Sequence, residues 1–376
     1  MKEKSADVIV VGAGIVGLAM AYHSAKKGKK VVVIERSQQA QGASIRNFGL
    51  IWPIGQPKGP LLDRALRSRS TWLEVAGEAG IWLNQNGSLQ LAHHQDEWDI
   101  INEFYDTNSN EGFQIEIVAA DKAKQLSPGI KSNGLKGGLL SSTECTVDPR
   151  EAISKLPGYL EKKYGVKVLF GTAVTSIEKD QVIAADITWR AEKIFVCSGA
   201  DFETLFPETF QQSGIIKCKL QMMRTGAQPH AWKVGPSLCA GLTLLHYSAF
   251  KDCKGLPALQ SRAQTDMPDL IKWGIHVLVS QNGNGELVLG DSHEYGLSLS
   301  PFDREEINEL IMSYLGTFFE APDMAINERW HGIYPKLQGK TEFVARVSDH
   351  TTIVNGLSGA GMTLSFGLAE ELANAL

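Results

Sequence analysis

Asp7-Val-Ile-Val-Val-Gly-Ala-Gly-Ile-Val-Gly17 decides the fold of this 376-residue chain, together with Lys30-Val-Val-Val-Ile-Glu35, which follows after a helix-like run. Residues 8–11 are four consecutive β-branched residues, a run typical of a buried parallel strand. The glycines after that strand have the G-x-G-x-x-G spacing of a dinucleotide-binding turn: Gly12, Gly14 and Gly17. The stretch therefore predicts a strand, a tight turn and a helix, followed by a second parallel strand that ends in an acid.

The residues of this turn have separate expected tasks in binding an adenosine diphosphate group. Gly12 permits the tight turn, Gly14 lets a pyrophosphate approach the backbone, and Gly17 lets the helix pack against the strand. Glu35 can accept both ribose hydroxyls, and the pyrophosphate would lie at the positive end of the helix dipole. The alternative is an α/β turn that binds no phosphate. The predicted contacts in this segment are Gly12, Ala13, Gly14, Ile15, Gly17, Glu35 and Arg36.

Length and charge indicate an enzyme of two domains or one interleaved pair of domains. The net charge is −5 and the basic residues are scattered, so we expect no nucleic-acid partner. No apolar segment is long enough to span a bilayer, and the glycine spacing explains the apolar run that ends at Ala21 better than a secretory signal does.

The cysteines point to a reducing compartment. Their number is odd and they form no C-x-x-C pair, which argues against a disulfide framework and against a zinc site. We therefore expect a cytoplasmic protein without a metal. The cysteines are Cys145, Cys197, Cys218, Cys239 and Cys253.

The segments after Glu35 alternate between helix and strand patterns. The small-residue loop Gly42–Gly49 suits a position against a flat ligand, although an ordinary connection is the alternative. Helical spacing or acidic patterning predicts helices, and alternating or apolar runs predict strands. The expected helices are 61–80, 96–110, 121–126, 151–164, 303–319 and one that begins near residue 357, and the expected strands are 87–92, 166–170, 173–177, 192–200 and 352–356.

Between residues 215 and 325 the pattern becomes antiparallel, with strands at 214–225, 274–281 and 286–293. The last two are joined by Asn282-Gly-Asn-Gly285, a hairpin signal that pairs positions whose numbers sum to about 567. That register places His276 beside Asp291, with His293 further along the same face, although a slip of one residue is the alternative.

Two further motifs, added to the N-terminal turn, carry a family resemblance. The mid-chain strand that ends in Cys197-Ser-Gly-Ala200 and the loop Ser358-Gly-Ala-Gly-Met-Thr363 resemble the FAD-dependent amine oxidoreductases of the D-amino-acid, glycine and sarcosine oxidase superfamily. The resemblance covers nearly the whole chain and implies an α/β fold, in which a Rossmann-like FAD-binding domain interleaves with an antiparallel-sheet substrate domain. The FAD-binding domain is expected at 1–85, 141–213 and 326–376, and the substrate domain at 86–140 and 214–325.

The same resemblance implies which other residues contact FAD. Glycines and small polar residues in the loops at 42–49, 198–199 and 356–363 form most of this set. We expect the FAD to be non-covalent, because Val344–Asn355 lacks the cysteine through which some relatives bind flavin. The implied contacts are Ser44, Asn47, Phe48, Gly49, Val174, Ser198, Gly199, Gly332, Gly356, Ser358, Gly359, Gly361, Met362 and Thr363.

Several stretches resemble a narrower clade, the aminophosphonate oxidoreductases associated with phosphonate breakdown. The resemblance implies oxidation of an aminoalkylphosphonate related to 2-aminoethylphosphonate, N-methylated in one alternative, by hydride transfer to flavin N5 and hydrolysis of the imine to an aldehyde. The stretches are Gly42–Gly49, Trp52–Gln56, Gly290–Gly296, Arg329–Tyr334 and Gly361–Glu370.

Four residues are candidates for the chemistry. His276 and His293 could take the amine proton or bind the anion, and the alternative for each is a structural or surface histidine. Arg46 could bind the phosphonate, or else FAD phosphate or a surface carboxylate. Tyr334 stands where relatives that bind carboxylates often have arginine, and it could also be plain pocket wall. His246 is a further candidate for the pocket, although a solvated histidine is its alternative.

Three functions remain open from the sequence. The first is oxidation of an aminoalkylphosphonate, the second a D-amino-acid, glycine or sarcosine type of oxidoreductase, and the third a non-catalytic FAD-binding subunit. Glu286–Gly290 lacks the lysine that assists oxygen in sarcosine-type oxidases, so the electron acceptor is either O2 or an unknown partner.

Overall fold

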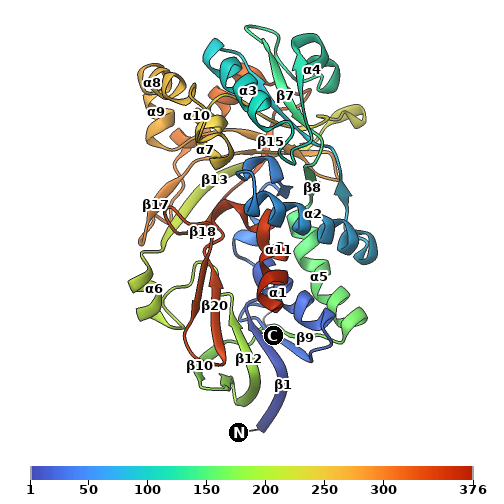
Figure 1. Cartoon of the computed structure of the whole chain (residues 1–376), viewed down its shortest axis with the longest axis vertical. Coiled ribbons are helices and arrows are strands. Elements are labelled where there is room, and N and C mark those ends of the chain that lie inside the picture. Colours follow the sequence, from blue (N-terminus) through green and yellow to red (C-terminus); the bar gives the residue numbers. More distant parts are fainter. Residues whose placement is uncertain (1, 375–376) are drawn as a thin grey trace.

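The computed structural model describes residues 2–374, and two large sheets organise them (Figure 1). Among these residues, eight strands form the sheet that contains the N-terminal strand. They are β1 (Lys2–Val11), β2 (Val31–Ile34), β9 (Lys167–Leu169), β10 (Val174–Glu178), β11 (Gln181–Ala184), β12 (Ile187–Val196), β19 (Phe343–Arg346) and β20 (Thr351–Asn355).

The centre of this sheet is parallel, as the N-terminal stretch predicts. β1 lies between β2 and β12 and runs parallel to both, and β20 runs parallel to β12. Val8, Ile9 and Val10 are buried because helices or further strands cover both faces of β1. Glu35 follows β2 directly, so the predicted acid stands at the carboxyl end of the sheet.

Four long helices pack together on this sheet around one apolar core: α1 (Ile15–Lys26), α2 (Pro60–Ala79), α5 (Pro149–Tyr164) and α11 (Gly361–Ala373). The short α6 (Pro207–Ser213) lies in a second cluster of the same sheet. Local sequence explains the ends of α5, because Asp148 accepts the amides of Arg150 and Glu151, and Gly165 ends the helix with a positive φ of 68°. The fully buried Trp72 donates its indole N–H to the carbonyl of Met362 at 2.7 Å, which joins α2 to α11.

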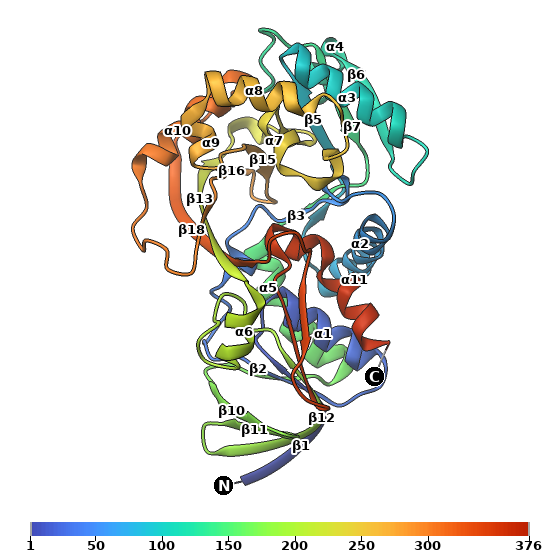
Figure 2. The same cartoon turned by 60° about the vertical axis from the view of Figure 1, so that its left-hand side comes forward.

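A second, mostly antiparallel sheet of nine strands is found among the described residues. Its long strands β13 and β18 run side by side from the upper part of the molecule toward the lower (Figures 1 and 2). The strands are β5 (Ser88–Ala92), β6 (Ile115–Ala119), β7 (Gly137–Ser141), β13 (Ile216–Ala227), β14 (Ser237–Cys239), β15 (Leu278–Gln281), β16 (Glu286–Gly290), β17 (Glu294–Gly296) and β18 (Ile326–Lys336).

Helices cover the far side of the nine-stranded sheet, and a small sheet joins the two parts of the molecule. The covering helices are α3 (Gln95–Asn108), α4 (Ala120–Leu126), α7 (Leu242–His246), α8 (Leu256–Asp266), α9 (Pro268–Lys272) and α10 (Glu305–Phe318). The small sheet contains β3 (Leu50–Ile51), β4 (Leu83–Asn84) and β8 (Cys145–Val147).

The predicted β15–β16 hairpin is present, but its register differs by one residue from the expected pairing. Val279 lies opposite Leu289, so the numbers of paired residues sum to 568 and not to 567. The regular ladder ends at Gly290, after which the N–H of Asp291 donates to the carbonyl of His276 at 3.0 Å. The predicted neighbourhood of His276 and Asp291 therefore holds, and the register of the ladder is the alternative that lies one residue away.

The predicted domain boundaries stay a prediction, and one segment bears on them. β18 belongs to the segment 326–376, which we expected in the FAD-binding domain, yet β18 pairs with β13 along nearly its whole length in the nine-stranded sheet. The following β19 and β20 lie in the eight-stranded sheet. The chain thus crosses between the two sheets after Lys336.

Candidate active site

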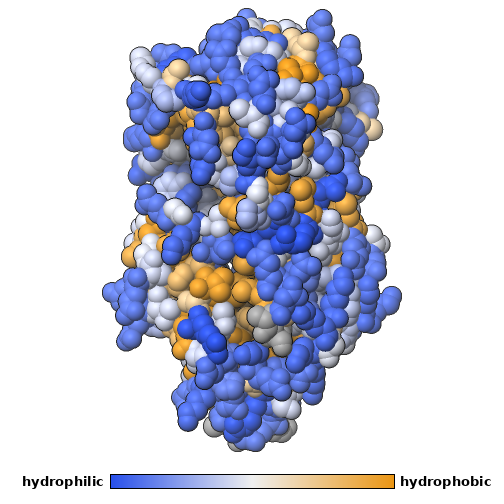
Figure 3. Space-filling model, viewed as in Figure 1, coloured by the Kyte–Doolittle hydropathy of each residue, from blue (hydrophilic) through white to orange (hydrophobic). Residues whose placement is uncertain are grey.

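A cavity of about 1120 Å³ reaches from the turn after β1 to the inner face of the nine-stranded sheet. It exceeds the roughly 300–1,000 Å³ of a typical small-molecule pocket, so it has room for a dinucleotide and a substrate together. Figure 3 shows a largely hydrophilic face on which hydrophobic residues gather at mid-height, beside α6 and β20.

Most of the predicted FAD contacts line this cavity. Ala13, Gly17 and Gly49 do not line it. The lining contacts are Gly12, Gly14, Ile15, Glu35, Arg36, Ser44, Asn47, Phe48, Val174, Ser198, Gly199, Gly332, Gly356, Ser358, Gly359, Gly361, Met362 and Thr363.

Gly17 and Gly49 have a structural reason to be glycine. A Cβ on Gly17 would lie 1.9 Å from the carbonyl oxygen of Gly12, and a Cβ on Gly49 would lie 1.8 Å from that of Val147. Gly49 also has a φ of +74°, which favours glycine. Both residues therefore shape the backbone behind the cavity, where only glycine fits.

Glu35 holds the nucleotide end of the cavity together. One carboxylate oxygen accepts the N–H of Ala13 and the other accepts the N–H of Ser37, each at 2.9 Å. An ionised carboxylate has about four lone-pair sites, so each oxygen can still accept a ribose hydroxyl. Glu35 thus fixes the turn after β1 and can also serve the ribose role predicted for it.

The N-terminus of α1 faces the cavity beside Glu35. Gly12 has a φ of +102°, and Gly14, at the N-cap position, makes no side-chain capping bond of its own. Ser44, from the loop 42–49, accepts the N–H of Ile15 at 3.0 Å. This arrangement of a helix N-terminus, a glycine turn and a ribose acceptor matches the chemistry of an adenosine diphosphate group.

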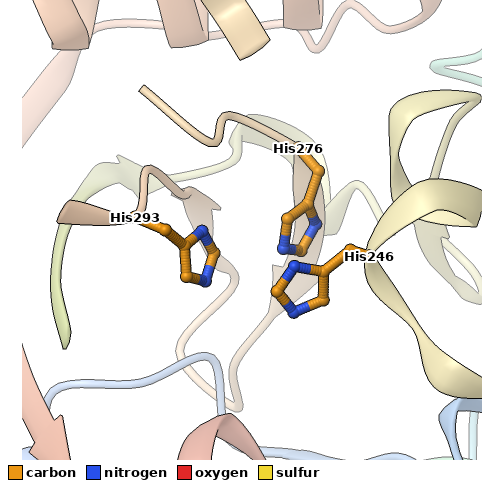
Figure 4. A group of neighbouring side chains, drawn as sticks. All are labelled: His246, His276 and His293. Atoms are coloured by element: carbon orange, nitrogen blue, oxygen red, sulfur yellow. The ribbon is translucent and has the colours of Figure 1, made fainter. Parts of the chain in front are cut away.

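The opposite end of the cavity contains a cluster of three histidines, His246, His276 and His293 (Figure 4). They come from the end of α7, from the residues before β15 and from the residues after β16. The imidazole centroids of His276 and His246 are 3.8 Å apart, and those of His276 and His293 are 5.1 Å apart. The structure therefore brings the two predicted histidines together and adds a third.

All three imidazoles are held in the neutral form. Burial lowers the pKa of His293 to about 4, and burial lowers the pKa of His246 and of His276 well below the usual range. Repulsion from the Lys336 ammonium group adds to each of these shifts. Each ring thus offers one N–H donor and one lone pair.

The N–H group of the His293 ring is already hydrogen-bonded. Its Nδ1 donates to the carbonyl oxygen of Gly274 at 2.9 Å, because a carbonyl can only accept. The free Nε2 of neutral His293 is then an acceptor. Both ring nitrogens of His276 lack a hydrogen-bond partner among the described residues, although Nε2 lies 3.5 Å from a carboxylate oxygen of Asp291.

The same three histidines also place one ring nitrogen each within 4.8 Å of the others, close enough to consider a shared metal ion. The positive charge of Lys336 acts on all three rings and opposes a divalent cation among them. We therefore do not assign these histidines as metal ligands.

Of the other predicted substrate residues, Arg46 and Tyr334 line the cavity. Arg46 donates to the carbonyl of His331 at 3.2 Å, and burial keeps the pKa of the Tyr334 phenol well above its usual range, so the phenol stays a donor. Arg329 and His331 of the same strand are directed elsewhere, because they pair with Glu305 and Asp303.

Sequence reasoning missed Lys336 and left His246 open. Lys336 is the last residue of β18, two positions after Tyr334, and both lie on the cavity. The period of two in a strand places residues 334 and 336 on one face. The expectation that Tyr334 lies in the pocket could therefore have predicted Lys336 there as well. His246 lies on the short helix α7, whose position over the hairpin depends on long-range packing.

The chain matches the family model described as DAO, FAD dependent oxidoreductase, over residues 7–375. The chain belongs to this family of FAD-dependent oxidoreductases. Membership confirms the predicted fold class and the predicted cofactor, and the cavity described above provides the glycine turn, helix N-terminus and acid that fit FAD. Residues 42–49 and 356–363 would hold the remainder of the cofactor.

Individual relatives are distant. The chain is 26% identical to D-amino acid dehydrogenase 2 of Mesorhizobium japonicum over 46% of this chain and 55% of that protein, so the match spans little more than half of the relative. It is 23% identical to glycine oxidase of Bacillus licheniformis, over 93% of this chain and 87% of the relative. The crystal structure of L-proline dehydrogenase from P. horikoshii has a TM-score of 0.78 at 21% identity, and covers 100% of this chain and 93% of that chain.

Within residues 2–374, the helices are too short or too polar to cross a membrane.

Proposed function

We propose that this chain oxidises an amine that also carries an anionic group, and that the amine is an aminoalkylphosphonate of the 2-aminoethylphosphonate type, with or without an N-methyl group. The oxidation of an amine is supported by family membership and by relatives named D-amino acid dehydrogenase and glycine oxidase. The choice of a phosphonate is supported by the sequence stretches that resemble aminophosphonate oxidoreductases and by the donors around the histidine cluster.

The observation that carries the phosphonate proposal is the kind of donor found at the substrate end of the cavity. Lys336, Tyr334 and the free N–H groups of His246 and His276 are single-point donors on one cavity. The three oxygens of a phosphonate can each accept from a separate donor, whereas a carboxylate presents two oxygens in one plane. Among the described residues, the arginines that line the cavity are Arg36, which pairs with Asp201, and Arg46, which donates to a backbone carbonyl.

When bound, FAD supplies the acceptor for the hydrogen and the two electrons that leave the substrate carbon. The chain's own task is to bind and orient the substrate. Lys336 would hold the anion, and Tyr334 would donate its hydroxyl beside the loop at Gly359, which its phenol approaches. Burial of the cluster strengthens each of these charge-assisted contacts.

An anaerobic stopped-flow panel tests the proposal by following loss of the oxidised flavin absorbance. We expect 2-aminoethylphosphonate or its N-methyl form to reduce the flavin with a higher ratio of rate to dissociation constant than sarcosine, glycine or D-alanine. Faster reduction by one of the carboxylates would replace the phosphonate with an amino acid. If no amine reduces the flavin, the chain is a non-catalytic FAD-binding subunit.

The distant relatives favour a second candidate, an amino-acid oxidoreductase of the D-amino-acid, glycine or sarcosine type. For this function Arg46 would have to leave the carbonyl of His331 and pair with a carboxylate. The two candidates therefore differ in whether Lys336 or Arg46 controls affinity, and the same panel on a Lys336→Gln variant separates them.

A further inference from the structure

Asp291 is a buried acid at the substrate end of the cavity with an unused oxygen. It lines the cavity, is 5% exposed, and its Oδ1 has no hydrogen-bond partner among the described residues. His276 Nε2 is 3.5 Å from that oxygen, beyond the usual hydrogen-bond distance. Buried polar groups in proteins are nearly always paired, so three adjacent atoms without partners, on Asp291 and His276, indicate a missing ligand.

Charge singles out Asp291 among the acids of the cavity. Glu35, Asp201 and Asp291 are the carboxyl groups that line it in the part of the chain that the structure describes. Glu35 accepts two backbone amides, and Asp201 accepts Arg36 and Thr204 at the nucleotide end. Asp291 is therefore the carboxyl that remains for a positively charged ligand.

We propose that Asp291, with His276 beside it, binds the ammonium group of the substrate and takes one proton from it before oxidation. This inference rests on the proposed function, in which the substrate is an amine with an anionic tail. Such a molecule is a zwitterion, and the cavity offers it donors at Lys336 and acceptors at Asp291. The free lone pair of His293 Nε2 belongs to the acceptor side.

The step moves one proton and no electrons. A nitrogen–hydrogen bond of the ammonium group breaks, and a hydrogen–oxygen bond forms on Asp291 or a hydrogen–nitrogen bond on His276. The amine keeps the electron pair, which it needs for the later loss of hydrogen from the neighbouring carbon. The proton on the pair returns to solvent when the product leaves.

The surroundings favour this transfer from both ends. Burial raises the pKa of the Asp291 carboxyl well above its usual range, which makes the carboxylate a stronger base. Burial and the nearby Lys336 charge both disfavour a second positive charge, which makes the ammonium group a stronger acid. The titratable or charged groups that surround Asp291 and His276 are His246, His293, Lys336, Tyr247, Tyr295, Tyr334 and Cys218.

The test is the pH dependence of flavin reduction in the FAD-loaded Asp291→Asn variant. We expect reduction by 2-aminoethylphosphonate at neutral pH to slow by about 100-fold or more, the usual range for loss of a general base. We also expect the alkaline-rising limb to move upward by at least about one pH unit, because the amine must then lose its proton to water. The dissociation constant of methylphosphonate, which has no amine, should stay within about threefold of the wild-type value.

Glu294→Gln is the matched control, since this acid follows three residues later and does not line the cavity. If Asp291→Asn fails to bind FAD, Asp291→Ala is used in its place, with and without added formate. Recovery of flavin reduction by 2-aminoethylphosphonate when formate is added supports the proposal. A rising limb at the wild-type pH in Asp291→Asn, or in Asp291→Ala without formate, overturns it.

The outcomes separate this inference from the proposed function. If wild-type flavin is reduced by D-alanine but not by 2-aminoethylphosphonate, the phosphonate assignment fails and the same pH test is made with D-alanine. If wild-type flavin is reduced but Asp291→Asn behaves like wild type, only the role of Asp291 is overturned. If no amine reduces the wild-type flavin, both proposals are overturned.

Discussion

Nζ of Lys219 lies 2.9 Å from a carboxylate oxygen of Asp303, and the lysine side chain is completely buried. The same ammonium group donates to the carbonyls of Ser300 and Phe302, at 2.9 and 2.7 Å. Lys219 is on β13, the strand that pairs with β18, so this contact ties the segment before α10 to the roof of the cavity. The ammonium group donates to three oxygens, and Asp303 supplies its counter-charge.

Asp303→Ala should destabilise the protein by about 3 kcal/mol, because it leaves a buried ammonium group without a counter-charge. Lys219→Met should cost less, since Asp303 is one-third exposed and keeps its contact with His331. Urea unfolding of both variants measures the order. Glu111→Ala, which removes an exposed partner of Lys58, is the control and should change stability by less than about 0.5 kcal/mol. Equal losses in the two variants would contradict this account.

Gly14→Val should abolish retention of FAD. The valine side chain would stand at the N-terminus of α1, where its Cβ would lie 3.0 Å from Ser44 Oγ and its methyl groups would occupy the place of the pyrophosphate. Purified wild-type protein should be yellow and release FAD on denaturation, and the variant should be colourless. Gly77→Val, at a position with nothing within 4 Å, controls for the general effect of valine. A folded, yellow Gly14→Val protein would contradict the assignment.

Lys336→Gln should weaken binding of the anionic substrate while FAD content stays the same. Loss of a charge-assisted contact in a desolvated site commonly costs on the order of 2–5 kcal/mol, which is tens- to thousands-fold in affinity. Titration of the oxidised enzyme with methylphosphonate, followed by flavin absorbance, measures the loss. Lys251→Gln is the matched control, because Lys251 also lines the cavity but is exposed. Equal affinity in wild type and Lys336→Gln would move the anion site to Arg46.

The FAD end could be predicted from the sequence because its chemistry is local. Gly12, Gly14 and Gly17 are each required for steric reasons in one turn, and Glu35 follows the next strand directly. Such demands leave a fixed spacing in the sequence. The C-terminal loop was predictable only through resemblance to a family. Its glycines line the cavity together with segments that are far away in the sequence, and no local spacing encodes that arrangement.

The substrate end was harder to predict because it depends on long-range register and packing. His276 and Asp291 lie together although the hairpin register is the alternative shifted by one residue, because the ladder ends at Gly290 and the N–H of Asp291 then donates to the carbonyl of His276. His246 reaches the cluster only through the position of α7, which no local pattern encodes. The tautomer of His293 depends on Gly274, nineteen residues away, and so lay beyond any motif.

The free energy of unfolding should fall at acidic pH because of the buried His293. Burial lowers the pKa of His293 to about 4, whereas the pKa in the unfolded chain is about 6.5. The unfolded state therefore binds more protons between these values, so the stabilising effect of neutral His293 is complete above about pH 6.5 and is lost as the pH falls toward 4. This difference in pKa corresponds to about 3 kcal/mol of stability, and the pKa values of His246 and His276 shift in the same direction.

Urea unfolding from about pH 7.5 to 4.5 should show a smaller loss of stability in His293→Gln than in wild type, whatever the difference in stability between the two proteins at neutral pH. The exposed His230, replaced by Gln, should leave the wild-type slope unchanged. A His293→Gln slope equal to that of wild type would mean that the pKa of this imidazole is the same in the folded and unfolded chains, which would contradict a buried, neutral acceptor beside Asp291.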